Sequence, residues 1–116
     1  MDKQAKKILL DIARKSIVAT ITGEIKPPFF CDHPDLLGKQ GVFVTLKTHE
    51  HLRGCIGRFV SDMPLYQMVS ELAISSATED PRFEFNRIKP QELNQLKIEI
   101  SVLSPLMPIK NPLDFE

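Results

Sequence analysis

The sequence predicts an α+β fold in which a mostly antiparallel sheet, including a hairpin, packs against two amphipathic helices. Residues 3–21 and 63–78 repeat apolar side chains at helical spacing. Residues 42–46 and 51–59 are two strand-like segments separated by a short polar stretch, which is typical of a hairpin. Residues 97–104 alternate in polarity and predict a third strand with one buried face.

The connections follow from glycine and proline. Gly23 should end the first helix, because glycine readily adopts the left-handed conformation found at helix ends. Residues 24–41 contain three prolines and two glycines, so they predict a long loop with one short turn at residues 35–37. Residues 48–50 should reverse the chain between the two strands of the hairpin.

The second helix should begin at a cap formed by Ser61 or Asp62, whose side chains can accept hydrogen bonds from free helix N–H groups. It should stop before Asp80, because Pro81 disfavours the helical conformation of the residue that precedes it.

The second half of the chain contains less regular structure. Phe83 and Phe85 are expected to anchor the loop after the second helix in the core, and residues 90–93 to form one helical turn. Beyond the third strand the chain is interrupted by three prolines: Pro105, Pro108 and Pro112.

Composition limits the class of protein. The 116 residues fit one domain with a modest core, and a hydrophobic content of 42% argues against disorder. Fifteen basic and fifteen acidic residues give zero net charge, which argues against a generic nucleic-acid binder. With no signal peptide and no apolar run that could span a bilayer, we expect a cytoplasmic protein whose two cysteines are reduced.

The segment at residues 52–57, LRGCIG, is the candidate working surface. Glycines inside a strand mark a bulge or the close approach of a ligand or another backbone. A guanidinium beside a thiol favours the thiolate, so Cys55 next to Arg53 is a candidate nucleophile. The alternative is that Cys55 is a small core residue. Strand alternation divides the segment into a core-facing set and an opposite set: Leu52, Gly54 and Ile56, against Arg53, Cys55 and Gly57.

Arginine is unevenly distributed. Four of the five arginines lie in one stretch of the chain: Arg53, Arg58, Arg82 and Arg87. Guanidinium groups bind carboxylate or phosphate through paired hydrogen bonds, so the cluster predicts an anion site. The alternative is that these arginines only pair with the acidic residues nearby, Glu79, Asp80 and Glu84. We expect Asp80 to meet Arg53 or Arg82 at the surface beside the LRGCIG segment, contributing about 0–1 kcal/mol.

Metal and cofactor sites are not predicted. Cys31, Asp32 and His33 are close in sequence, as are His49 and His51, but their spacings match no defined zinc motif. No glycine-rich phosphate loop precedes a helix.

The order of four motifs resembles that of the AMMECR-one domain family. These are residues 41–46 (GVFVTL), 52–57 (LRGCIG), 80–83 (DPRF) and 98–104 (IEISVLS). The resemblance extends over nearly the whole chain, and it implies an α+β fold, an intracellular location and no agreed activity. Because similar chains continue beyond this C-terminus, it also implies that residues 1–116 are a single domain lacking its C-terminal part. The thin sheet and the abrupt end after Pro112 predict that this chain alone is less stable than a longer version.

The resemblance also marks site residues by position. They are Arg53, Gly54, Cys55 and Gly57 in the first motif and Asp80, Pro81 and Arg82 in the second. Some prokaryotic relatives are associated with a Memo-type domain and a radical S-adenosylmethionine protein, which implies a shared pathway. We therefore expect a ligand- or substrate-binding module, catalytic through Cys55 or not, that takes an anionic small molecule or a protein partner. The alternative is a non-catalytic protein-interaction domain in a basic process such as transcription, translation or repair.

Overall fold

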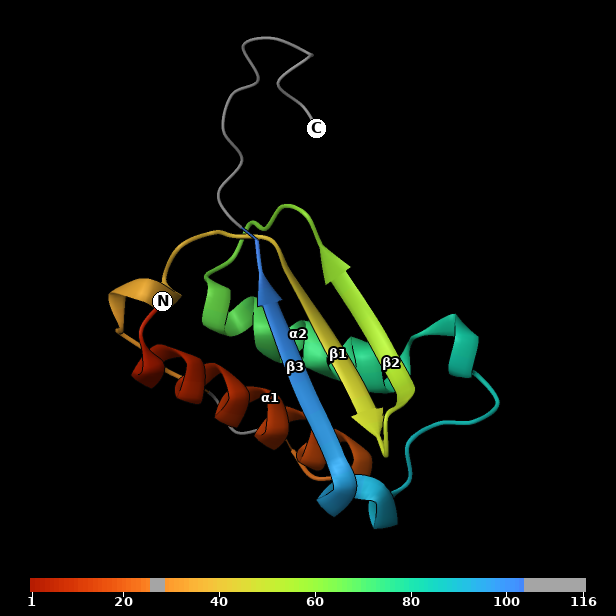
Figure 1. Cartoon of the computed structure of the whole chain (residues 1–116). Helices are drawn as coiled ribbons and strands as arrows, with labels where there is room; N and C mark the ends of the chain where they lie inside the picture. The colour runs from red at the N-terminus through yellow and green to blue at the C-terminus, as the bar shows by residue number, and fades with distance from the viewer. Residues whose placement is uncertain (26–28, 104–116) are drawn as a thin grey trace, which may run out of the picture.

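The computed structural model describes residues 1–25 and 29–103, which form a three-stranded antiparallel sheet with two helices on one face (Figure 1). The helices are α1 (Lys3–Thr22) and α2 (Leu65–Thr78). The strands are β1 (Val42–Thr48), β2 (His51–Arg58) and β3 (Leu96–Val102), in the order β2-β1-β3. The predicted α+β class is confirmed, and the other face of the sheet is left open by the described residues (Figure 1).

Some predicted features lie outside the described residues. These are Ser104 at the end of the third strand and the three prolines beyond it, Pro105, Pro108 and Pro112, as well as Pro27 and Pro28 of the long loop. Within the part of the chain that the structure describes, no helix is both long enough and apolar enough to cross a membrane.

Helix α1 has a side-chain cap at its start and a glycine at its end. The Asp2 carboxylate accepts a hydrogen bond from the Ala5 N–H at 2.7 Å, which satisfies one of the free donors of the first turn. Gly23 closes the helix with a φ of 77°, as predicted. The buried stripe of the helix packs against α2, where the hydroxyls of Ser16 and Ser70 lie 2.7 Å apart.

The β1–β2 hairpin turns at His49 and Glu50, whose φ angles of 48° and 68° are those of a two-residue turn with left-handed residues. The strand register then shifts: Leu46 pairs with Gly54, but Lys47 pairs with Leu52. Arg53 is therefore the extra residue of a β-bulge.

The bulge corrects the predicted alternation of the LRGCIG segment. Leu52 pairs with Lys47 on the open side of the sheet, so it does not share the core-facing side with Gly54 and Ile56. Alternation holds only while both strands advance one residue at a time, and Arg53 interrupts it. As the extra residue, Arg53 falls outside the alternation from which a face shared with Cys55 was predicted.

Helix α2 begins without the predicted side-chain cap. Pro64 occupies the N-cap position, and neither the Ser61 nor the Asp62 side chain caps the helix. The Ser61 hydroxyl instead bonds the backbone of Met63, accepting from its N–H and donating to its C=O. The free N–H of Leu65 is satisfied by the Gly38 carbonyl at 2.9 Å, so the long loop provides the cap.

Helix α2 packs unusually close to the hairpin. A Cβ added at Gly54 would lie 2.0 Å from the Ser76 carbonyl oxygen, so only glycine fits at this position. The Ser76 hydroxyl accepts from the Ile56 N–H at 3.0 Å and donates to the Val44 carbonyl at 2.9 Å. Helix α2 is thereby bonded to β1 and β2 at once, two residues before it ends at Thr78.

Replacing Gly54 by alanine should destabilise the fold by about 2 kcal/mol or more, because backbone would have to move to admit the methyl group. Gly38→Ala is the matched control: its Cβ would meet only the end of the Gln40 side chain, at 3.5 Å. Urea denaturation of the two variants measures the difference. An unfolding midpoint for Gly54→Ala equal to that of Gly38→Ala would contradict the close packing.

Candidate functional site

The LRGCIG and DPRF segments meet at the outer edge of β2, joined by the Asp80 carboxylate. Asp80 Oδ2 accepts from the Cys55 N–H at 3.0 Å and from Arg82 Nη2 at 2.7 Å. Asp80 Oδ1 accepts from the Arg82 backbone N–H at 3.0 Å and from Arg82 Nε at 3.1 Å. Of the two arginines considered as its partner, Asp80 binds Arg82.

The expectation that Asp80 lies at the surface is wrong, since the residue is 1% exposed. The outward-facing N–H of Cys55 draws the carboxylate onto the strand edge, where Arg82 covers it. The Arg82 hydrogen bonds hold the pKa of Asp80 far below its usual range, although burial opposes the shift. The same contact raises the pKa of Arg82, so the pair is charged at neutral pH.

Arg82 is fixed and yet open to solvent. Its side chain is 57% exposed, while Nε and Nη2 are engaged by Asp80. Nη2 also approaches the Cys55 carbonyl at 3.4 Å, and the guanidinium carbon lies 5.7 Å from the centre of the Phe83 ring. Among the described residues Nη1 has no hydrogen-bond partner, so its two N–H groups are available to a ligand.

Arg53 is buried and paired elsewhere. Only 8% exposed, it donates from Nε to Glu92 Oε2 at 3.0 Å and from Nη2 to Glu92 Oε1 at 3.1 Å. These bonds lower the pKa of Glu92. The guanidinium also lies 5.9 Å from the centre of the Phe83 ring. Its partner is therefore a carboxylate, and the predicted pairing with the Cys55 thiol is replaced by this contact.

Cys55 lies on the open face of the sheet. Its sulfur is 3.2 Å from the Thr45 hydroxyl on the neighbouring strand. Cys31, by contrast, packs against the hydrophobic core. Gly57, next on the same face, has a packing explanation like that of Gly54, because a Cβ there would meet the Phe43 ring at 2.0 Å.

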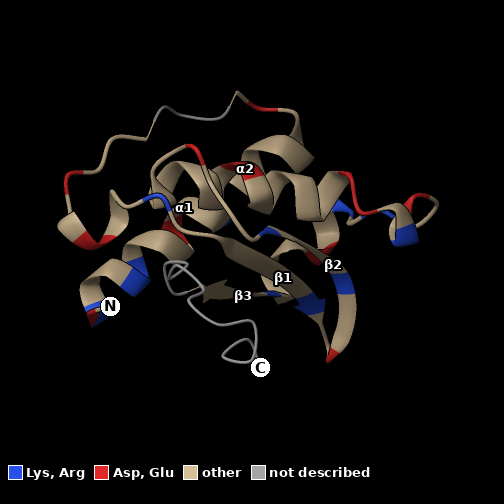
Figure 2. Cartoon of the chain, turned by 90° about the horizontal axis from the view of Figure 1, so that it is seen from above, with Lys and Arg blue, Asp and Glu red and all other residues tan. Residues whose placement is uncertain are grey.

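Of the other charged residues considered in the sequence, some contact the site and others are exposed to solvent. Arg87 donates to the Asp80 carbonyl at 2.8 Å, so three of the four clustered arginines converge on the segment that begins at Asp80. In Figure 2 basic and acidic segments lie next to each other where this loop passes β2. Glu79, the residue that follows α2, accepts a hydrogen bond from the Ser75 hydroxyl, and Arg58 is exposed.

The aromatic anchors of the loop behave differently from the prediction. Phe83 is half-buried, but Phe85 is 96% exposed. Pro81–Phe83 forms a short 3₁₀ turn capped by Asp80, and Ile88, 6% exposed, is the residue that reaches the core. Two aromatic residues two positions apart suggested a paired anchor, whereas the turn directs only the first toward the sheet.

Glu92 was not identified by sequence reasoning. It lies in the 3₁₀ helix Pro90–Gln95, where it also accepts from the Lys89 N–H at 3.2 Å. That local pattern signals a helix start and gives no indication of a partner 39 residues away.

A cluster of possible metal ligands lies at the other end of the molecule. Ligand atoms of Asp2, His33 and Asp35 are within 4.8 Å of one another. However, the Asp35 N–H donates to His33 Nδ1 at 3.2 Å, which places the ring proton on Nε2, the atom that faces Asp2. The three residues thus form hydrogen bonds with one another, and Cys31 is not part of the cluster.

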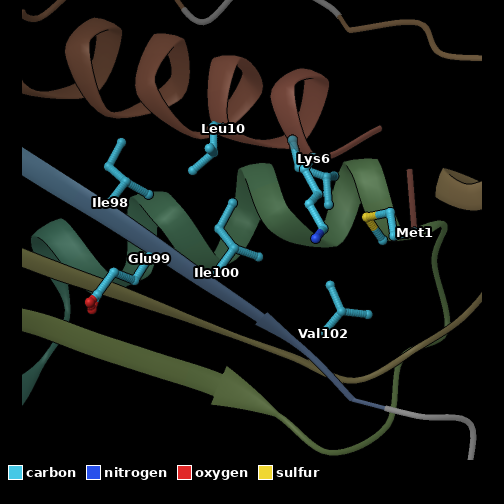
Figure 3. A pocket seen from close by; sticks show the side chains of 8 residues that line it. Met1, Lys6, Leu10, Ile98, Glu99, Ile100 and Val102 are labelled. Carbon is cyan, nitrogen blue, oxygen red and sulfur yellow. The ribbon is translucent and has the colours of Figure 1, made fainter. Parts of the chain in front are cut away.

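A hollow of about 490 Å³ lies between α1 and β3. Figure 3 shows Leu10, Ile98 and Ile100 pointing into it and Lys6 reaching down from α1. Its lining is mainly apolar and contains none of the site residues predicted from the sequence.

Replacing Asp80 by asparagine should lower the free energy of unfolding at pH 7 by about 2 kcal/mol, because the negative charge and one of the two oxygens that accept from Arg82 and Cys55 are removed. This contribution is complete above the unfolded pKa of 3.8 and is lost as pH falls through it toward the lower folded pKa. Urea denaturation at pH 7 and pH 3 should therefore show the difference between the two proteins shrinking in acid. The control Asp11→Asn, in an exposed ion pair, should change the free energy of unfolding by less than about 0.5 kcal/mol. If the unmodified protein and Asp80→Asn differ in stability by the same amount at pH 7 and pH 3, the stabilising role of the ionised Asp80 carboxylate is contradicted.

Comparison with known proteins places the chain in a family. The AMMECR1 family model, which describes the AMMECR-one domain, matches residues 10–116. A protein of Methanothermobacter thermautotrophicus is 40% identical over 112 residues, which are 94% of this chain and 57% of that protein. Protein MK0488 of Methanopyrus kandleri is 42% identical over 117 residues, covering 94% of this chain and 54% of its own.

A solved structure agrees with the fold. The crystal structure of the uncharacterized protein PH0010 from Pyrococcus horikoshii matches with a TM-score of 0.71 and 40% identity, over 91% of this chain and 54% of that one. This chain thus spans about half the length of the relatives it matches. On the family model and these relatives together, the chain belongs to the AMMECR1 family.

Proposed function

We propose that this AMMECR1 domain is a ligand-binding module that recognises an anionic group, a carboxylate or a phosphate, through Arg82 at the outer edge of β2. The observation that carries the proposal is an exposed guanidinium held in place by a buried carboxylate. Asp80 is covered, whereas Nη1 of Arg82 faces away from the contacts that hold it. A ligand anion therefore meets a donor pair that is already oriented, which reduces the entropy cost of binding.

The charges around Arg82 support the same conclusion. Three guanidinium groups, those of Arg53, Arg82 and Arg87, lie at this corner with the carboxylates of Asp80 and Glu92. These five hydrogen-bonded groups carry one net positive charge, and the exposed carboxylates of Glu79 and Glu84 in the same loop lie outside their network. The module is thus suited to a small anion or an acidic group on a partner, and not to a nucleic-acid backbone, which requires a broad basic surface.

Replacing Arg82 by lysine should weaken the binding of inorganic phosphate about fivefold, the equivalent of about 1 kcal/mol, because lysine cannot keep the paired geometry. The matched control is Arg58→Lys, which makes the same change at an exposed arginine at the end of β2. Phosphate titration followed by the amide and arginine Nε–H resonances of nitrogen-15-labelled protein measures both. Equal affinities in the two variants, or phosphate-induced shifts confined to the lysines of α1, would refute the proposal.

Cys55 is the candidate nucleophile if the module is also catalytic. Its thiol lies on the open face of the sheet, whereas Cys31 packs on the core, so iodoacetamide should label Cys55 faster. Mass spectrometry of the labelled protein over a range of pH gives the two rates. If both thiols react slowly and equally, Cys55 has no role as a nucleophile, while anion binding by Arg82 is unaffected by that result.

A protein partner is a second candidate for the ligand. Phe85 is 96% exposed in the loop that follows Arg82, and Phe59 is 70% exposed just beyond β2. Apolar side chains this open favour a protein surface over a small molecule as the partner. An acidic partner segment would then supply the carboxylate that Arg82 binds.

A further inference from the structure

The Phe83 ring connects the exposed guanidinium of the site to a buried ion pair. The guanidinium carbon of Arg82 lies over the ring at 5.7 Å from its centre, and that of Arg53 at 5.9 Å. A cation over an aromatic face is attracted by the π electrons of the ring. One half-buried ring therefore contacts both arginines.

Arg53 is itself held from its other side. Glu92 accepts two hydrogen bonds from it, at 3.0 and 3.1 Å, and is tied to the Lys89 N–H at 3.2 Å. Arg53 is only 8% exposed, and the two hydrogen bonds to Glu92 hold its guanidinium against the ring. The contacts run from Glu92 through Arg53 and Phe83 to Arg82.

Asp80 and Phe83 restrain Arg82 in complementary ways. The Asp80 carboxylate binds Nε and Nη2, along one edge of the guanidinium. The Phe83 ring lies against the group and opposes tilting about that edge. An arginine that binds an anion through paired hydrogen bonds needs its plane defined as well as its position.

We propose that Glu92, Arg53 and Phe83 are positioning residues that set the orientation of the Arg82 guanidinium for the ligand anion. The inference rests on the proposed function and extends it to residues that do not touch the ligand. It changes the role of Arg53, which the sequence suggested as a ligand contact. In the structure Arg53 donates its hydrogen bonds to both carboxylate oxygens of Glu92. It also adds Glu92, which lies outside both motifs.

The test uses Glu92→Gln, which keeps the shape of the side chain and removes its charge, and Phe83→Leu, which removes the ring. Each should shift the Nε–H resonance of Arg82 and weaken phosphate binding about threefold, the size expected for one cation–π contact. The combined variant should lose little more than either alone, since both changes break the same series of contacts. Phe83→Tyr keeps the ring and should restore both properties.

Glu99→Gln is the matched control, because Glu99 pairs with Lys47 on the open face at 3.3 Å and has no contact with this series. The inference is overturned if Glu92→Gln and Phe83→Leu lower the unfolding midpoint but leave the Arg82 resonance and the phosphate affinity at wild-type values. That result would leave the proposed function standing. If instead the unmodified protein binds no phosphate, the proposed function fails, and the Arg82 resonance in the variants still decides the positioning role.

Discussion

The buried carboxylate of Asp80 is the interaction on which the candidate site depends. It accepts hydrogen bonds from the Cys55 N–H, from the Arg82 backbone and from the Arg82 guanidinium, and so joins residues 25 positions apart. Without it, the outer edge of β2 would expose the unpaired N–H of Cys55. An edge strand of this kind invites pairing with other chains, and Asp80 with Arg82 covers it.

Close packing of α2 on the hairpin brings Asp80 to that position. Gly54 lets the helix backbone approach β2, and the Ser76 hydroxyl bonds both strands of the hairpin. Pro81 then ends the helical path and starts the 3₁₀ turn that Asp80 caps. Gly54, which suggested a ligand contact in the sequence, therefore has a structural role. The close approach that it permits sets the position of the Asp80 carboxylate.

Much of this arrangement could be predicted from local patterns. Periodicity and turn residues were sufficient for the two helices, the hairpin, the third strand and the end of α1 at Gly23. The meeting of the DPRF and LRGCIG segments could be expected because the helix follows the hairpin after a short connection and packs back against the sheet. These features depend on residues close in sequence or on the packing of one element on its neighbour.

The features that sequence reasoning missed depend on distant contacts. The bulge at Arg53 changes the face of Leu52, and nothing in the alternating pattern of β2 indicates where a register shifts. Glu92 becomes the partner of Arg53 only because the 3₁₀ helix Pro90–Gln95 lies near the end of β2, 39 residues away. Burial of Asp80 likewise depends on an outward-facing backbone N–H, which a sequence does not display.

Hydrogen exchange of the Cys55 amide tests the central role of Asp80 most directly. This N–H points away from β1 to the outer edge of an edge strand, and among the residues that the structure describes only the Asp80 carboxylate accepts it. In native conditions it should exchange slowly in the unmodified protein and become one of the fast-exchanging amides of β2 in Asp80→Ala, while the Ile56 amide, bonded to Ser76, stays protected. An equally slow Cys55 amide in both proteins, or a fast one in both, would contradict the account.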